Sequence, residues 1–352
     1  MKKILFGCLW FLGIAVLLVV LWKAFPDQQA QRQSSEPAPS QTQIPMKTDK
    51  NFHVQEPIQP IPLGVPQDPS KIELGRQLFN DTKLSKDNSI SCASCHFLNK
   101  GGADFRKFSM GVDGNIGNVN APSVYNSGYN FKQFWDGRSD TLEEQVNGPT
   151  HNPAEMASNW DEIVSKLKED PAYSSEFPKV YSDGITNVNV RDAIATFERS
   201  LITPNSRFDK FLRGDANALS DQEKRGYKLF KQYGCTVCHQ GINVGGNMFQ
   251  TFGKFGNYFE DRGNITKADL GRMNVTGDAK DKYKFKVPAL RNTELTAPYF
   301  HDGSAVTLED AVRVMAKYQL GVSPSDEDVK AIVEFLKSLT GEYKGQSLKD
   351  IQ

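Results

Sequence analysis

Apolar residues recur at helical spacing along several stretches of the chain, and these stretches predict a mainly helical protein. Thr141, Thr307 and Ser325 are candidate N-caps, and Gly341 stands where a last helix would end. Strand signals are weak, and the connecting segments contain many Gly, Asn and Pro residues. The predicted fold class is therefore all-α with long loops, with helices at 70–80, 141–147, 159–168, 188–202, 220–232, 307–319 and 325–339.

The first 66 residues do not follow this pattern. Residues 4–22 carry no charge, and as a helix they would measure roughly 28 Å, enough to cross a bilayer. Lys2 and Lys3 precede the run and favour a cytoplasmic N-terminus. A cleaved signal peptide and lipidation at Cys8 are the alternatives, but no small-x-small cleavage site follows the run. We expect an uncleaved inner-membrane anchor at 1–25, a flexible linker rich in Gln, Pro and Ser at 26–66, and the rest facing the periplasm.

The remaining chain repeats itself, which predicts two modules from an internal duplication, at 67–214 and 215–352. The stretch 75–79 matches 226–230. Further on, nine identical pairs are each separated by 166 positions. Their first members are Pro122, Asn126, Phe134, Asp136, Gly137, Thr141, Leu142, Glu143 and Val146, and their second members are Pro288, Asn292, Phe300, Asp302, Gly303, Thr307, Leu308, Glu309 and Val312.

Each module contains one Cys-x-x-Cys-His pentad, the attachment site of c-type haem. The pentads are Cys92 to His96 and Cys235 to His239. A disulfide or a zinc site would need partners, yet the only other cysteine is Cys8. We therefore expect two covalent haem c groups, bound through Cys92, Cys95, Cys235 and Cys238, with His96 and His239 as proximal iron ligands. Lys and Arg balance Asp and Glu at 42 each, so no nucleic-acid partner is expected.

The two modules differ in the candidate sixth ligand of iron. Met315 lies on an apolar helical stripe and is a candidate thioether ligand. The position 166 residues earlier is Pro149, which has no donor atom in its side chain. The first haem would then have an open face, near Gln145 and Glu155. A carboxylate there could move a proton between the oxygens of bound peroxide.

From about residue 67 onward the chain resembles the bacterial dihaem cytochrome c peroxidases, with the methylamine-utilisation enzyme MauG as a more distant relative. The resemblance is carried by several motifs in one order. These are Asn120-Ala121-Pro122, residues 133–138, Glu155-Met156, residues 285–292, residues 298–303 and residues 335–341.

The resemblance implies a peroxidatic haem on His96 and an electron-transferring haem on His239 and Met315. It also implies Gln145 and Glu155 as distal catalytic residues, Trp135 between the haems, and a calcium ion. The calcium would be bound by the Asn120 side chain and by the backbone carbonyls of Thr296 and Pro298, an all-oxygen set. His301 is expected to form hydrogen bonds near a haem propionate, and His151 is a polar residue of the distal loop or a proton relay.

The chain departs from the family pattern in the loop after the first pentad. Many members carry a histidine there that caps the reactive iron until the other haem is reduced, and this chain has Val112 instead. We expect the first haem to be five-coordinate or water-bound when both irons are ferric. Ligation by Met110 is the alternative.

The function expected is reduction of hydrogen peroxide to water with electrons from a cytochrome c, a cupredoxin or a quinol. One alternative is a MauG-like oxidase that modifies a partner protein through high-valent haem; MauG has a tyrosine in place of Met315. The other is a dihaem module that only transfers electrons. A homodimer is possible, since the family often dimerises.

Overall fold

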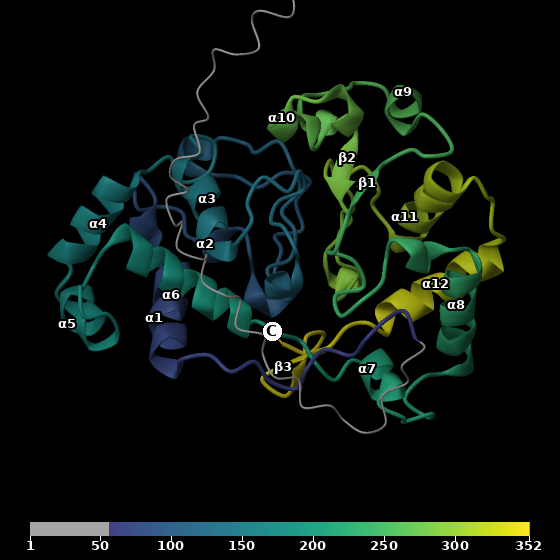
Figure 1. Ribbon diagram of the computed structural model, residues 1–352, viewed down its shortest axis with the longest axis horizontal. Coiled ribbons are helices and arrows are strands. Elements are labelled where there is room, and N and C mark those ends of the chain that lie inside the picture. Colours follow the sequence, from purple (N-terminus) through teal and green to yellow (C-terminus); the bar gives the residue numbers. More distant parts are fainter. Residues whose placement is uncertain (1–55, 352) are drawn as a thin grey trace, which may run out of the picture. The chain divides into compact units, whose positions relative to one another are not determined.

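The computed structural model describes residues 56–351 (Figure 1). Its helices are α1 (Pro69–Asn80), α2 (Leu142–Gln145), α3 (Asn147–His151), α4 (Trp160–Glu169), α5 (Pro171–Val180), α6 (Asn187–Ser200), α7 (Arg207–Leu212), α8 (Asp221–Gln232), α9 (Tyr258–Arg262), α10 (Met273–Thr276), α11 (Leu308–Met315) and α12 (Asp326–Lys337). Its strands are β1 (Phe249–Thr251), β2 (Lys284–Lys286), β3 (Glu342–Tyr343) and β4 (Gln346–Ser347).

The strands make the all-α prediction wrong. β1 pairs antiparallel with β2, with Phe249 opposite Lys286, and β3 pairs antiparallel with β4. The strands of the first pair are about 30 residues apart in the chain and only three residues long. A segment this short shows no alternation that sequence analysis can detect, and its pairing is fixed by the tertiary fold. The protein is mainly helical with two small sheets.

The predicted membrane anchor is not supported. The apolar run at 4–22 lies outside the described residues, and within 56–351 no helix is long and apolar enough to cross a membrane. The prediction of an inner-membrane protein facing the periplasm is corrected accordingly.

A helix pair packed through glycine forms the centre of each half. α1 packs against α6, and a Cβ atom on Gly75 would lie only 1.9 Å from the Ala193 carbonyl oxygen. α8 packs against α12, and a Cβ on Gly226 would lie 1.9 Å from the Ala331 carbonyl oxygen. Only glycine allows backbones to approach this closely. The matched glycines of the two repeats therefore allow the same close contact between helices in each half. Each helix pair supports the pentad that follows its first helix.

The loops after the pentads also share backbone geometry. Asn126 and Asn292 both adopt left-handed conformations, with φ of 61° and 62°. The two asparagines also meet, because both side-chain amides donate to the hydroxyl of Thr203, at 2.8 and 3.1 Å. Asn292 is fully buried and Asn126 nearly so. This polar link fixes one half against the other.

Each end of the described chain packs against the opposite half of the protein. Ile58, within the predicted linker, is buried among core residues of the second half and forms a β-bridge with Gly241. Leu348 packs in a cluster with Phe79 and Phe197 of the first half. The division at residues 214 and 215 stays a prediction.

Candidate functional site

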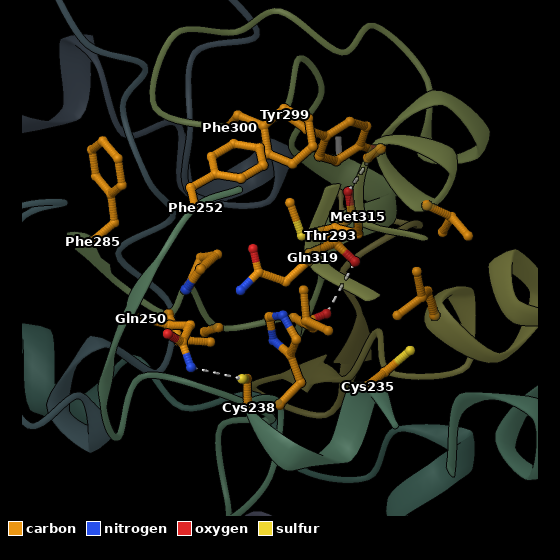
Figure 2. Close-up of a pocket in the computed structure, with 18 of the residues that line it drawn as sticks. Cys235, Cys238, Gln250, Phe252, Phe285, Thr293, Tyr299, Phe300, Met315 and Gln319 are labelled. Atoms are coloured by element: carbon orange, nitrogen blue, oxygen red, sulfur yellow. Dashed lines mark hydrogen bonds between the residues drawn. The ribbon is translucent and has the colours of Figure 1, made fainter. Parts of the chain in front are cut away.

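A large cavity surrounds the second pentad. Cys235, Cys238 and His239 line it, and so does Met315, the last residue of α11. Figure 2 shows the two cysteines on one side of the cavity and Met315 on the other, with Phe252, Tyr299 and Phe300 above. The lining is mostly apolar and includes no Asp or Glu. Such a lining suits an apolar group.

His239 is held in the orientation that metal binding requires. Its Nδ1 lies 3.3 Å from the carbonyl oxygen of Val244, which accepts the Nδ1 proton and leaves Nε2 free. Burial lowers the pKa of His239 to about 4, so the imidazole is neutral. Neutral imidazole with one nitrogen bonded to a carbonyl is the usual form of a metal-ligating histidine.

The segment after Met315 is a π-helix at residues 316–320. Gln319 in this segment donates to the Thr251 carbonyl at 3.0 Å and accepts from the Gly253 N–H at 3.1 Å. These bonds join the wall that carries Met315 to strand β1. π-Helical turns are frequent at functional sites.

The residues around the second pentad fit a covalently attached haem. Cys235 and Cys238 are free thiols, and burial raises the pKa of Cys235 to about 12. The other two cysteines among the described residues, Cys92 and Cys95 of the first pentad, are also free, so no disulfide joins any of the four. Two thiols, a neutral imidazole and a thioether facing one apolar cavity match the donor set of haem c.

The first pentad has the same local geometry. Nδ1 of His96 lies 3.1 Å from the carbonyl oxygen of Gly102, which itself has a φ of 79°. Burial lowers the pKa of His96. Both histidines therefore make the same kind of hydrogen bond, from Nδ1 to a backbone carbonyl. The two sites differ in the residues around the histidines.

Glu155 lies close to the first pentad. Its Oε1 accepts a hydrogen bond of 2.6 Å from the Asn152 side-chain amide, and burial raises the pKa of its carboxyl group. Burial, with smaller contributions from the carboxylates of Asp104 and Glu155, raises the pKa of Cys95 to about 11. A carboxyl group with a raised pKa, one oxygen bonded and the other available, can hold and deliver a proton.

The other residues expected around the first haem differ in their burial and in their contacts. Gln145 ends α2 half-buried, and no described residue forms a hydrogen bond with its side-chain amide. His151 is exposed and packs edge-on against Trp160, with ring centres 5.8 Å apart. Met110 has 41% of its surface exposed.

Trp135 and His301 meet at the boundary of the halves. The Trp135 indole N–H donates to the Asn120 carbonyl at 2.8 Å, and the two rings lie edge to face with centres 6.3 Å apart. Nε2 of His301 is 2.7 Å from a carboxylate oxygen of Asp269, which also pairs with Arg262. Both rings line the cavity of the second pentad, so a side chain of the first half contacts the site of the second.

The three expected calcium ligands line this cavity too. The Asn120 amide donates to the Arg106 carbonyl at 2.8 Å, which leaves its Oδ1 without a partner among the described residues. Within the same range, the carbonyl oxygens of Thr296 and Pro298 accept no hydrogen bond. Three free oxygens of this kind suit a hard cation.

Sequence reasoning gave no role to Lys286, a nearly buried cation that lines the cavity. No signal in the sequence separates it from Lys284 on the same strand, because its burial depends on segments distant in the sequence, such as that of Trp135, whose carbonyl accepts the Lys286 backbone N–H.

The family model of di-haem cytochrome c peroxidase matches residues 69–217. The cytochrome c peroxidase Ccp of Escherichia coli is 53% identical over 83% of this chain, which spans 62% of that protein. The cytochrome c551 peroxidase of Nitrosomonas europaea is 48% identical, over 82% of this chain and 85% of its own length. The crystal structure of a MauG-like protein associated with microbial copper homeostasis superposes with a TM-score of 0.69 and 29% identity, over 84% of this chain and 95% of that one.

These relatives span both pentads and the motifs between them. The chain therefore belongs to the di-haem cytochrome c peroxidase family, as a peroxidase-type oxidoreductase with two haem c groups.

Proposed function

We propose that the chain reduces hydrogen peroxide beside His96 and draws electrons from an external donor through the site of His239 and Met315. One peroxide, two protons and two electrons give two waters. The observation that carries the proposal is the difference between the two sites. Met315 lines the cavity of His239, whereas the matching position of the first repeat is Pro149 and a proton-holding carboxyl group, Glu155, lies near Cys95.

When bound, the two haem c groups supply the redox chemistry, and the protein supplies ligation, access and placement. Glu155 moves a proton between the two oxygens of peroxide through its free carboxylate oxygen, since Asn152 holds the other. Burial raises the pKa of Glu155, which favours a group that accepts and returns a proton. Gln145 orients the substrate with its unpaired amide, and Trp135 lies on the electron route between the sites.

We also propose that a calcium ion binds Asn120, Thr296 and Pro298. The ion would fix the Asn120 loop, whose carbonyl accepts the indole N–H of Trp135. Calorimetric titration of the holo protein with Ca²⁺ tests this, with Asn120→Ala expected to abolish the binding.

Glu155→Gln tests the catalytic proposal. Loss of the proton carrier should lower kcat/KM for peroxide by about 10²- to 10⁴-fold, while the spectra of both haems stay as in the parent protein. Glu169→Gln, an exposed carboxylate on α4, is the matched control. Equal turnover by Glu155→Gln and the parent would refute the role and would favour a module that only transfers electrons.

The main alternative function is that of a MauG-like oxidase, which modifies a partner protein. The similarity to the structure of a MauG-like protein favours this alternative. Met315 favours the peroxidase, because a thioether ligand raises the potential of a c-type haem and so suits a haem that accepts electrons from a donor. Steady turnover of peroxide with a reduced cytochrome or cupredoxin distinguishes the two. A homodimer stays a prediction.

A further inference from the structure

We propose that the ammonium group of Lys286 pairs with a propionate carboxylate of the haem attached at Cys235 and Cys238. This inference rests on the assignment of that haem to the cavity of the second pentad. It adds a positioning residue that tunes the electron-transfer site.

Lys286 ends strand β2 and is fixed from both sides. It lies opposite Phe249 of β1 in the antiparallel pair. Its backbone N–H donates to the carbonyl oxygen of Trp135 at 2.8 Å. Lys286 is one of the residues that line the cavity, and the whole residue is only 7% exposed.

The charges around the cavity leave Lys286 without a counter-ion. Besides the candidate iron ligand His239, three basic side chains line the cavity, and none of its lining residues is acidic. Arg291 forms a buried ion pair of 2.8 Å with Asp209, and His301 is 2.7 Å from Asp269. Among the described residues no hydrogen-bond acceptor or carboxylate pairs with the Lys286 ammonium. Lysine is almost never buried without a partner, so the missing anion belongs to the group that fills the cavity.

Haem supplies that anion. The apolar macrocycle fits the apolar walls, and its two propionates are the carboxylates that the protein lining lacks. Burial alone lowers the pKa of Lys286 to about 8. A nearby carboxylate opposes this effect and favours the charged ammonium.

The pairing has a consequence for electron transfer. A positive charge beside the haem stabilises the reduced form, which has one positive charge fewer on iron than the oxidised form. Lys286 also bonds through its backbone to Trp135, so the same residue links the haem edge to the residue between the two sites. We therefore expect Lys286 to raise the reduction potential of the haem ligated by His239.

Optical redox titration of the full-length holo protein tests the inference. Lys286→Met, which keeps the length of the side chain, should lower the ratio of reduced to oxidised second haem by about tenfold at a fixed potential, equivalent to about 59 mV. Lys286→Arg should stay within about twofold of the parent. Lys284→Met is the matched control, because Lys284 is on the same strand but pairs with Asp281 at 2.6 Å.

Two results would overturn the inference: an unchanged midpoint in Lys286→Met, or an equal shift in Lys284→Met. Should Lys286→Met not fold, Lys286→Gln keeps a polar end and is titrated instead, with the same two outcomes. The titration does not depend on peroxide turnover. Its failure is therefore distinguishable from failure of the Glu155 test.

Discussion

The backbone N–H of Val112 donates to the carbonyl oxygen of Glu155 at 2.8 Å, which fastens the loop after the first pentad to the segment that carries the proposed catalytic carboxyl group. Val112 is almost fully buried. The neighbouring Gly111 allows the close approach, since a Cβ there would lie 2.5 Å from the same carbonyl. The family resemblance led us to look for a histidine in this loop, and this chain has instead an apolar residue packed against the Glu155 segment.

Val112→His is expected to restore a cap on the first iron. Imidazole is a strong ligand, so the fully oxidised variant should show low-spin first haem and should need reduction before it reacts with peroxide. The parent should show a high-spin first haem without any reduction. Absorption and EPR spectra of the oxidised proteins measure both. Val112→Leu, which stays apolar, is the control, and a high-spin spectrum in Val112→His would show that position 112 does not reach the iron.

Local signals in the sequence predicted most helices. Thr141, Thr307 and Ser325 are confirmed as N-caps, because each side chain accepts from a backbone N–H three residues on. Capping is decided within one turn, so the sequence contains the information. Gly341 has a different role from the one expected. α12 ends at Lys337, and Gly341 packs against the carbonyl of Thr203.

Features that depend on distant residues were not predictable. The helix expected at 307–319 ends at Met315 and continues as a π-helix, which Gln319 fastens to β1. Pairing of β1 with β2 and the burial of Lys286 likewise depend on contacts between segments far apart in the sequence. The pentads could be recognised because haem attachment depends on residue types at a fixed spacing, whereas Glu155 stays a prediction from spacing and family resemblance. A lysine that lacks a counter-ion can be recognised only in the folded chain.

Met315→His is expected to lower the potential of the second haem. A thioether raises the potential of a c-type haem relative to a second imidazole. The ratio of reduced to oxidised second haem should fall by tenfold or more at fixed potential, about 59 mV at least. Redox titration measures it, with Met273→His on α10, outside the cavity, as the control. A midpoint that does not move would show that Met315 is not an iron ligand.

Trp135→Phe is expected to slow electron transfer between the haems. The variant loses the indole N–H that bonds to Asn120 and part of the ring between the sites. Oxidation of the second haem after mixing with peroxide should slow by about tenfold, a barrier increase of about 1.4 kcal/mol. Stopped-flow spectroscopy follows this step. Trp160→Phe removes an indole bond of the same length, to Asn147, outside the cavity, and equal slowing in both variants would contradict the assigned route.

We expect Glu198 to make the stability of the protein depend on pH. It is 6% exposed on α6, and no described residue forms a hydrogen bond with its Oε2. Burial raises the pKa of Glu198 from 4.5 to about 8. The folded state therefore keeps a proton that the unfolded chain releases, and stability that is complete below pH 4.5 declines as the pH rises to about 8. The slope is at most about 1.4 kcal/mol per pH unit for one such group.

Glu198→Gln removes this titration and keeps the shape of the side chain. The variant should be more stable than the parent at pH 8, and the difference should shrink as the pH falls toward 5. Guanidinium unfolding of the holo proteins at pH 5, 6.5 and 8 measures it. Glu169→Gln, exposed on α4, should follow the parent at each pH. If the profiles of parent and Glu198→Gln run parallel, the pKa of Glu198 is the same in the folded and the unfolded protein, which contradicts the expected titration.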